Sequence, residues 1–365
     1  MIVLSLNAGS SSLKYKLIDT RSSEVLDAGV IERIGAPGAP ADHEEAFAQI
    51  PHLDEVHAAG HRVVHGGDQF SASVLIDDAV EAAIEALIPL APLHNPVNLA
   101  VIRAGRHRLP HIPHVAVFDT AFHAAVAPAA YTYGLPFDLA ERWKIRRYGF
   151  HGTSHRYIAS RFPQDKKLIT LHLGNGCSAA AIRDGHSVDT TMGMTPLEGL
   201  MMGTRPGDLD PGILLRLMEW EGWDAAALDR LLNRESGLLG LSGISNDMRE
   251  LEAHATQGHA RAALAIDVFC HRVRRAIGSL YAVLNGADAL VFTGGIGENS
   301  PAVREKVCRD LDALGIALDP RRNAQIKAVE ARISPPEART EVWVVPTNEE
   351  LLVARDAAAV AASLP

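Results

Sequence analysis

Apolar residues form two similar strand-turn-strand patterns, one at the start of the chain and one in its middle. The strands are Ile2–Leu6 and Leu13–Ile18 around the turn Asn7–Ser12, then Leu168–Leu173 and Ala179–Arg183 around the turn Gly174–Ser178. Both turns carry glycine beside hydroxyl or amide side chains, so backbone N–H groups can approach an anion closely. The repeat therefore predicts two phosphate-binding hairpins that hold the phosphate chain of a nucleotide from both sides.

The rest of the chain alternates apolar strands with amphipathic helices, which predicts an α/β protein. Further strands are expected at Glu24–Ile34, Val115–Phe118, Ala289–Phe292 and Val342–Val345. Helices are expected up to Ile50 after the loop Gly35–Pro40, at Ala79–Leu87, at His94–His107, at Ala262–Leu284, from Pro301, and from the Thr347 region to Ser363. Ala262–Leu284 has the clearest apolar stripe at helical spacing.

The two halves of the chain correspond beyond their hairpins. Val117–Ala121 resembles Val291–Gly295, and both segments close a strand-and-helix series, so we predict an internal duplication. Asp119 follows a buried strand, where open α/β sheets meet their ligands. Gly294–Asn299 is predicted to be a glycine loop before a helix, a plausible nucleotide contact. Thr347 and Glu350 have capping-box spacing for the last helix.

Composition narrows the class of protein. The 365 residues have 47% hydrophobic content and a net charge of -9, so we expect two domains and neither nucleic acid nor an anionic membrane as partner. Cys177, Cys270 and Cys308 share no close spacing, which fits a reducing compartment. The N-terminus lacks a signal-peptide pattern, and no apolar run approaches the length of a membrane span. The expectation is a cytoplasmic protein.

Eight segments make the chain resemble a known family. They are Asn7–Lys14, Gly60–Gly67, Ala91–Pro96, Phe118–His123, Tyr148–His155, Thr195–Arg205, Gly295–Asn299 and Thr347–Glu350. Taken in this order, the eight segments resemble those of the acetokinase family, the acetate kinases. That family belongs to the superfamily that contains acetate and sugar kinases, Hsp70 and actin. The chain departs from the family pattern mainly by being short around Gly35–Pro51, which removes none of these segments.

The resemblance implies duplicated ribonuclease H-like (actin-like ATPase) domains with a central ATP cleft. The first would comprise residues 1–123 and 352–365, on the substrate side. The second would comprise residues 124–351, on the adenosine side. The family also implies a homodimer formed through the second domain, with the Ala262–Leu284 region as the candidate for burial there.

The implied reaction transfers the γ-phosphoryl group of ATP to acetate, giving acetyl phosphate and ADP. In-line phosphoryl transfer is catalysed mainly by positioning and electrostatics. By resemblance the catalytic residues are Arg62, Asp119, His151, Asn175 and Arg205. Asn7, Asp119 and Glu349 would hold Mg²⁺, with Mn²⁺ as a substitute. We interpret Asp119 as a holder of the metal or its water, because acetate is already ionised at neutral pH and needs no general base.

The same resemblance implies two binding regions. Acetate would be held by Arg62, Val64, Leu93, His94, Phe150 and Pro196. ATP would be held by Ser10, Ser12, Lys14, His172, Leu173, Gly174, Asn175, Gly176, Asp247, Met248, Arg249, Gly295, Ile296, Gly297, Glu298 and Asn299. A small apolar pocket discriminates weakly, because one methylene is worth roughly 1–3 kcal/mol.

Alternative interpretations remain at this stage. A propionate or butyrate kinase of the same family shares these motifs, as does a variant using another phosphoryl donor. A non-kinase ATPase of the actin and Hsp70 type would use the hairpins but not Arg62, Arg205 or His151. A nicotinamide dehydrogenase is disfavoured because no G-x-G-x-x-G follows the first strand. A zinc site at His151 and His155 is disfavoured because Gly152 argues against a helix there.

Overall fold

The computed structural model describes residues 1–364, which fold into two compact units. Unit 1 comprises Met1–Ala124, Phe150–Tyr157 and the chain from Asn348 onward, and unit 2 comprises Ala125–Gly149 and Ile158–Thr347. From the sequence, residues 124–351 were expected to form the second domain as one continuous segment. Residues 150–157 join unit 1 because they pack there: the Gly152 N–H donates to the Asp119 carbonyl at 3.0 Å, and Tyr157 packs against the apolar core around Val3.

Unit 1 is built on a six-stranded sheet of order β3-β2-β1-β4-β6-β5. The strands are β1 (Ile2–Gly9), β2 (Ser12–Asp19), β3 (Glu24–Glu32), β4 (Ala58–Val63), β5 (Val74–Leu75) and β6 (His114–Phe118). The helices are α1 (His43–Phe47), α2 (Asp78–Ala86), α3 (Asn95–Arg108) and α15 (Glu349–Ala362), with α6 (Gly152–Ala159) beginning here. The first three strands form an antiparallel meander, and β4 and β6 continue parallel to β1.

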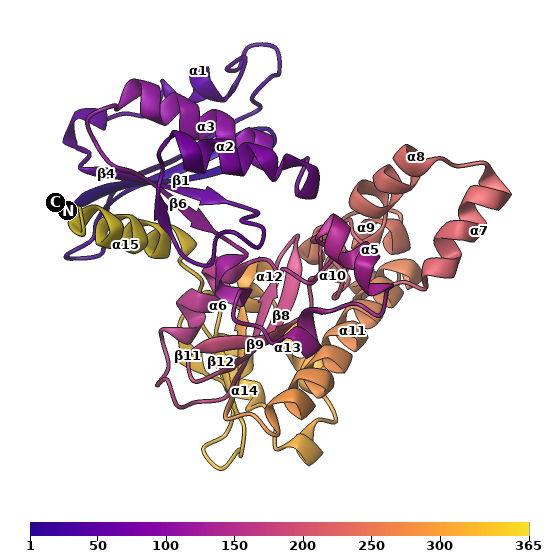
Figure 1. Ribbon diagram of the computed structural model, residues 1–365. Coiled ribbons are helices and arrows are strands. Elements are labelled where there is room, and N and C mark those ends of the chain that lie inside the picture. Colours follow the sequence, from indigo (N-terminus) through magenta and orange to yellow (C-terminus); the bar gives the residue numbers. More distant parts are fainter. Residues whose placement is uncertain (365) are drawn as a thin grey trace. The chain divides into compact units, whose positions relative to one another are not determined.

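Helices cover both faces of this sheet. Alternate residues of β1 point to opposite faces, so Leu4 joins the core under α1 and α3 while Val3 joins the core under α15. Figure 1 shows α2 and α3 on one face and α15 on the other. At Gly60 of β4, an added Cβ atom would lie 2.7 Å from Val353 of α15, so glycine permits the close approach of this helix.

Unit 2 contains a second six-stranded sheet, of order β11-β12-β10-β7-β8-β9. The strands are β7 (Leu168–Leu173), β8 (Cys177–Arg183), β9 (His186–Thr190), β10 (Ala289–Thr293), β11 (Ala331–Arg332) and β12 (Glu341–Val344). The helices are α4 (Pro128–Tyr131), α5 (Phe137–Trp143), α7 (Pro211–Glu221), α8 (Ala225–Arg230), α9 (Gly237–Ser242), α10 (Met248–Thr256), α11 (Ala260–Leu284), α12 (Gly294–Asn299), α13 (Pro301–Cys308) and α14 (Pro320–Gln325). The α/β class is confirmed.

The strand orders of the two sheets match, and they correct the correspondence predicted between the halves. A meander (β1-β2-β3 or β7-β8-β9) is followed outward by two parallel strands and an antiparallel edge strand in both units. Thus β4 corresponds to β10, and β6 corresponds to β12. The sequence had aligned Val117–Ala121 with Val291–Gly295, because local similarity of two buried strand ends carries no information about their place in a sheet.

Three local predictions are also corrected. Gly294–Asn299 is the helix α12 and not a loop. The last helix is capped by Asn348, whose side chain accepts from the Leu351 N–H, and not by Thr347. A helix does begin at Gly152, because the missing side chain lets its backbone reach the Asp119 carbonyl, where a Cβ atom would lie only 2.0 Å away.

Helix α11 has the predicted apolar stripe, and unit 2 itself covers it. Ile266, Phe269, Val273 and Ile277 are all buried, and α11 packs on α9, α10, α13 and β8. This stripe is therefore covered within unit 2, and a dimer contact through the Ala262–Leu284 region stays a prediction for the other faces of the helix. No helix within residues 1–364 is long and apolar enough to cross a membrane.

Candidate active site

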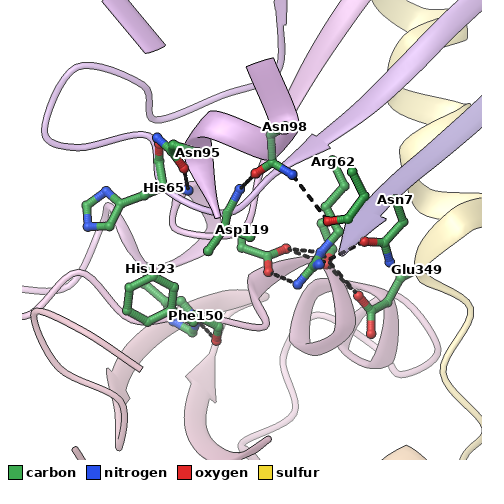
Figure 2. A network of polar contacts seen from close by, with 12 residues as sticks. Asn7, Arg62, His65, Asn95, Asn98, Asp119, His123, Phe150 and Glu349 are labelled. Atoms are coloured by element: carbon green, nitrogen blue, oxygen red, sulfur yellow. Dashed lines mark hydrogen bonds and ion pairs between the residues drawn. The ribbon is translucent and has the colours of Figure 1, made fainter. Parts of the chain in front are cut away.

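A cluster of charged and amide side chains lies at one edge of the unit 1 sheet (Figure 2). Asn7 comes from β1, Arg62 from β4 and Asp119 from the residue after β6. Glu349 lies in the first turn of α15. The carboxyl ends of three neighbouring parallel strands and one helix N-terminus thus bring together residues from both ends of the chain. Asp119 is fully buried, with 0% of its surface exposed.

Arg62 forms the centre of this cluster. Its Nε donates to Asp119 Oδ1 at 3.1 Å, and its Nη2 donates to Asp119 Oδ2. Its Nη1 donates to Asn7 Oδ1 at 3.0 Å, and Glu349 Oε2 lies 3.7 Å from Nε. A guanidinium fork is suited to a bidentate grip on a substrate carboxylate or phosphoryl group, but in Arg62 this fork is occupied by Asp119. Guanidinium has five N–H donors, so two remain on the terminal nitrogens.

Thr153, in the first turn of α6, joins the two carboxylates. Its Oγ1 lies 2.8 Å from Asp119 Oδ1 and 3.1 Å from Glu349 Oε2, so its single proton serves one carboxylate at a time. Burial and the nearby Asp119 charge raise the pKa of Glu349 despite the opposing effect of Arg62. Burial alone would lower the pKa of Arg62, but Asp119 and Glu349 outweigh it and raise that pKa.

His151 precedes α6 in an uncommon backbone conformation. Its φ is 56°, in the left-handed region, and the following Gly152 N–H is held by the Asp119 carbonyl. This contact ties the backbone that carries His151 to the strand end that carries Asp119. The structure therefore brings His151, Arg62 and Asp119 into one unit, whereas the domain boundaries expected from the sequence placed His151 in the second domain.

The predicted acetate-binding residues lie in both units. In unit 1, Val64 and Phe150 are buried, whereas Leu93 is 43% exposed. His94 immediately precedes α3. In unit 2, the Pro196 carbonyl accepts from Arg205 Nη1 at 2.7 Å.

Two buried amides in α3 hold the backbone after β4, and the sequence did not single them out. Asn98 Oδ1 accepts from the Val64 N–H at 3.1 Å, and Asn95 bonds both the N–H and the carbonyl of His65 (Figure 2). Asn95 lies inside the family-like segment Ala91–Pro96, in which the resemblance marks His94 as the binding residue. The sequence pattern that could have indicated this role is an asparagine, Asn95, at the start of a predicted helix and among apolar residues.

Arg205 lies on a tight loop of unit 2. At Gly237, whose φ is +63°, an added Cβ atom would lie 2.2 Å from the Met202 carbonyl and 2.8 Å from the Arg205 carbonyl, so glycine is required. No carboxylate within residues 1–364 pairs with Arg205, and burial lowers the pKa of its guanidinium. A half-buried guanidinium of this kind is suited to an anionic ligand.

A hollow of about 750 Å³ in unit 2 collects the residues predicted to bind ATP. Its lining includes Gly174, Asn175, Asp247, Met248, Arg249, Gly295, Ile296 and Asn299. The structure adds Asn246, Glu252, Ser300 and Lys327, which no sequence motif marked. The remaining predicted residues of this unit, His172, Leu173, Gly176, Gly297 and Glu298, lie outside the lining.

Glu298 has a structural position instead. Its Oε1 accepts from the Gly294 N–H at 2.9 Å and from the Thr347 N–H at 3.1 Å, so it ties the start of α12 to the end of the β12 segment. Ser10, Ser12 and Lys14 belong to the β1-β2 hairpin of unit 1, and Lys14 is exposed opposite Asn7 in the strand pairing.

The donor set in unit 1 fits a hard cation better than a soft one. Among residues 1–364 no group of three or more His, Cys, Asp or Glu side chains forms a metal cluster. Asn7, Asp119 and Glu349 instead offer one amide and two carboxylates around a single guanidinium. Oxygen donors of this kind, in small number, suit Mg²⁺, which keeps part of its water shell.

Comparison with known proteins shows the family to which the chain is similar. The acetokinase family model matches residues 41–355. The chain is 49% identical to the acetate kinase of Natranaerobius thermophilus over an alignment of 393 positions, which covers 98% of both chains.

Two solved structures have nearly the same fold. The acetate kinase of Porphyromonas gingivalis has a TM-score of 0.94 and 44% identity, with 98% of this chain and 99% of that one covered. A propionate kinase from Francisella tularensis has a TM-score of 0.94 and 40% identity, with the same coverage.

Proposed function

The chain belongs to the acetokinase family, and we propose that it is an acetate kinase, which reversibly transfers the γ-phosphoryl group of ATP to acetate. The observation that carries the proposal is the buried constellation of Arg62, Asp119, Asn7 and Glu349 in unit 1. It supplies fixed charges of both signs, as transfer of an anionic group to an anionic acceptor requires.

The acceptor needs no general base. Acetate is ionised at neutral pH, since model carboxyl groups have pKa values of about 4. Both Asp119 oxygens already accept hydrogen bonds from Arg62, which supports a role in fixing that guanidinium rather than in removing a proton. Arg62 is thereby oriented, and its two remaining N–H groups are the donors we assign to acetate or the phosphoryl group in flight.

Asn7, Asp119 and Glu349 are the residues we propose to hold magnesium, directly or through water. Mg²⁺, when bound with ATP, neutralises charge on the β- and γ-phosphoryl oxygens. The two carboxylates carry two negative charges and the guanidinium among them carries one positive charge. The excess of negative charge favours binding of a cation. The raised pKa of Glu349 reflects the same crowding of negative charge.

His151, Asn175 and Arg205 are assigned to the transferring group itself. In the transition state the charge lies on three equatorial oxygens, which fixed donors stabilise. Arg205 has no carboxylate partner within residues 1–364, and burial makes its charge less favourable without an anion. Both facts support an anionic ligand at Arg205. The hollow lined by Met248 and Ile296 is assigned to the adenosine part of ATP.

Acetate is the proposed acceptor because the relative from Natranaerobius thermophilus and other relatives at 47–50% identity are named acetate kinases. Val64 and Phe150 supply buried apolar surface for a methyl group. A pocket of this kind discriminates a single methylene by about 10–200-fold. We therefore expect propionate to be used less well and butyrate to be used poorly.

The first experiment is acyl-phosphate formation from ATP and Mg²⁺, trapped with hydroxylamine, with acetate, propionate, butyrate or no acid. The proposal expects acid-dependent product with acetate as the preferred acceptor. Preference for propionate would make this a propionate kinase. ATP turnover without acid dependence would indicate a non-kinase ATPase, and absence of product with ATP would call for another phosphoryl donor.

We also propose that the protein forms a homodimer through the exposed apolar side chains of α7. Leu215 and Trp220 are 69% and 71% exposed, and large apolar side chains exposed together on a short helix indicate an interaction surface. A second copy is the partner that the family resemblance implies. Light scattering of the wild type should give twice the mass of 39.2 kDa. L215E/W220E should give the monomer mass, whereas L26E, an exposed leucine of β3, should not change it.

A further inference from the structure

The side-chain amide of Asn175 is held by a second amide in the unit 2 hollow. Asn246 Nδ2 donates to Asn175 Oδ1 at 2.9 Å, and both residues line the same hollow. Asn175 belongs to the β7-β8 turn, whereas Asn246 lies in the loop before α10. The contact therefore joins the proposed phosphate turn to the loop that begins the proposed adenosine segment.

Gly203 holds Asn175 from another side. Its N–H donates to the Asn175 carbonyl at 2.9 Å. A Cβ atom at Gly203 would lie 2.0 Å from Asn175 Oδ1. The side-chain oxygen of Asn175 thus fits into the space left by glycine while it accepts from Asn246.

This arrangement fixes which end of the Asn175 amide is available. An amide is planar, with its oxygen and its NH₂ on opposite sides. The side-chain oxygen of Asn175 is bonded by Asn246 and lies against Gly203, so its NH₂ is directed away from both residues. Within residues 1–364 no protein group accepts a hydrogen bond from Asn175 Nδ2. Two N–H donors therefore remain for an anion.

We propose that Asn246 is a positioning residue that orients the Asn175 amide so that its NH₂ group donates to the phosphoryl group in transfer. The inference rests on the proposed kinase function. Its physical content is preorganisation: a donor held in place before reaction stabilises developing charge without first having to turn.

A purely structural role for Asn246 is less consistent with the loop that carries it. Ser242 Oγ donates to the Ser245 carbonyl at 3.0 Å, and Ser245 Oγ accepts from the Asp247 N–H at 3.0 Å. These bonds hold the loop without the Asn246 side chain, which is exposed.

The decisive variant is Asn246→Asp, because a carboxylate can only accept hydrogen bonds. It would draw the Asn175 NH₂ toward residue 246 and turn the Asn175 oxygen toward the phosphoryl group. Losing an oriented donor of this kind reduces kcat by about 100-fold. Asn246→Ala leaves the Asn175 amide free to turn and should reduce kcat by only about fivefold, the factor expected for one net hydrogen bond.

The test measures kcat and the KM for ATP separately, in the wild type and in an Asn175→Ala background. If Asn246 acts through Asn175, N246D lowers kcat in the wild type but not further in N175A. Gln257→Glu adds the same charge at the exposed end of α10 and controls for long-range electrostatics. It should leave kcat unchanged.

Three outcomes would overturn the inference. They are a wild-type kcat in N246D, an equal loss of kcat in both backgrounds, and an effect confined to the KM for ATP. The last would make Asn246 a direct nucleotide contact. Failure of the proposed function is distinguishable from all three, because the wild type itself would then form no acyl phosphate with acetate.

Discussion

Removal of Arg62 tests whether the unit 1 cluster is held together by one buried cation. Only 17% of the Arg62 side chain and 1% of the Asp119 side chain are exposed. In Arg62→Ala, two carboxylates would face each other with Thr153 between them and no compensating charge. Removing one partner of a buried ion pair costs about 3–5 kcal/mol. In a unit of 150 residues each kcal/mol lowers Tm by about 2–4 °C, so we expect a loss of about 10 °C.

The loss should depend on pH because Glu349 can relieve it by binding a proton. Its folded pKa is raised above the ordinary 4.5 even with Arg62 present, and loss of Arg62 should raise it further. A raised folded pKa means that the folded chain binds the proton more tightly than the unfolded chain. The resulting stabilisation is fully present below about pH 4.5 and is lost as pH rises through the folded pKa. R62A should therefore be closer to the wild type at pH 5 than at pH 8.

The assay is calorimetric unfolding of wild type, R62A and R62A/E349Q between pH 5 and 8, with acyl-phosphate formation measured on the same samples. E349Q should restore part of the lost stability at pH 8, because it removes one of the two facing charges. Turnover in R62A should fall by about 10³-fold or more, as for other arginines that contact a transferring phosphoryl group. Near-normal turnover, or a stability loss independent of both pH and E349Q, would refute this account of the cluster.

Three further predictions distinguish residues whose charge serves catalysis from residues whose contacts stabilise the fold. Arg205→Ala should abolish turnover with little change in Tm, because its guanidinium has no carboxylate partner within residues 1–364; a large Tm loss would contradict this. Gly152→Ala should destabilise unit 1 by about 1–3 kcal/mol and reduce kcat, since its Cβ atom would lie 2.0 Å from the Asp119 carbonyl, whereas Gly278→Ala, with no atom within 4 Å, should be neutral or stabilising. Arg304→Lys should lower unfolding free energy by about 3 kcal/mol, because lysine has three donors and Arg304 makes five bonds; urea denaturation that matches wild type would argue otherwise.

The predicted strands and long helices follow from patterns that are local. Apolar runs such as Val115–Phe118 become buried strands because their backbone and burial preferences agree. The stripe of α11 likewise appears at helical spacing and is buried in the structure. Where the prediction from sequence was wrong, a tertiary contact determines the local structure. Gly152 looks like a helix breaker until the Asp119 carbonyl approaches it within hydrogen-bond distance.

The site was predictable only as far as motifs marked it. Arg62, Asp119 and Glu349 were singled out and do converge, but their pairing was not foreseeable, because nothing in the sequence says that Asp119 occupies the Arg62 fork. Asn246 gave no signal, since one exposed amide has no spacing to recognise. Arg304 reads as a surface arginine of an amphipathic helix, yet it is fully buried with carbonyl and amide partners.

The helix α15 has a consequence for how the protein is made. It supplies Glu349 to a cluster begun by Asn7, and its Val353, Ala354 and Ala357 complete the core beneath β1 and β4. During synthesis, most of unit 1 is translated before unit 2, but unit 1 lacks α15 until residues 349–362, which follow unit 2 in the chain, have left the ribosome. A ribosome-bound unit 1 therefore exposes one apolar sheet face and carries Arg62 and Asp119 without their third partner. The unit 1 cluster can therefore be completed only after the whole of unit 2 has been synthesised.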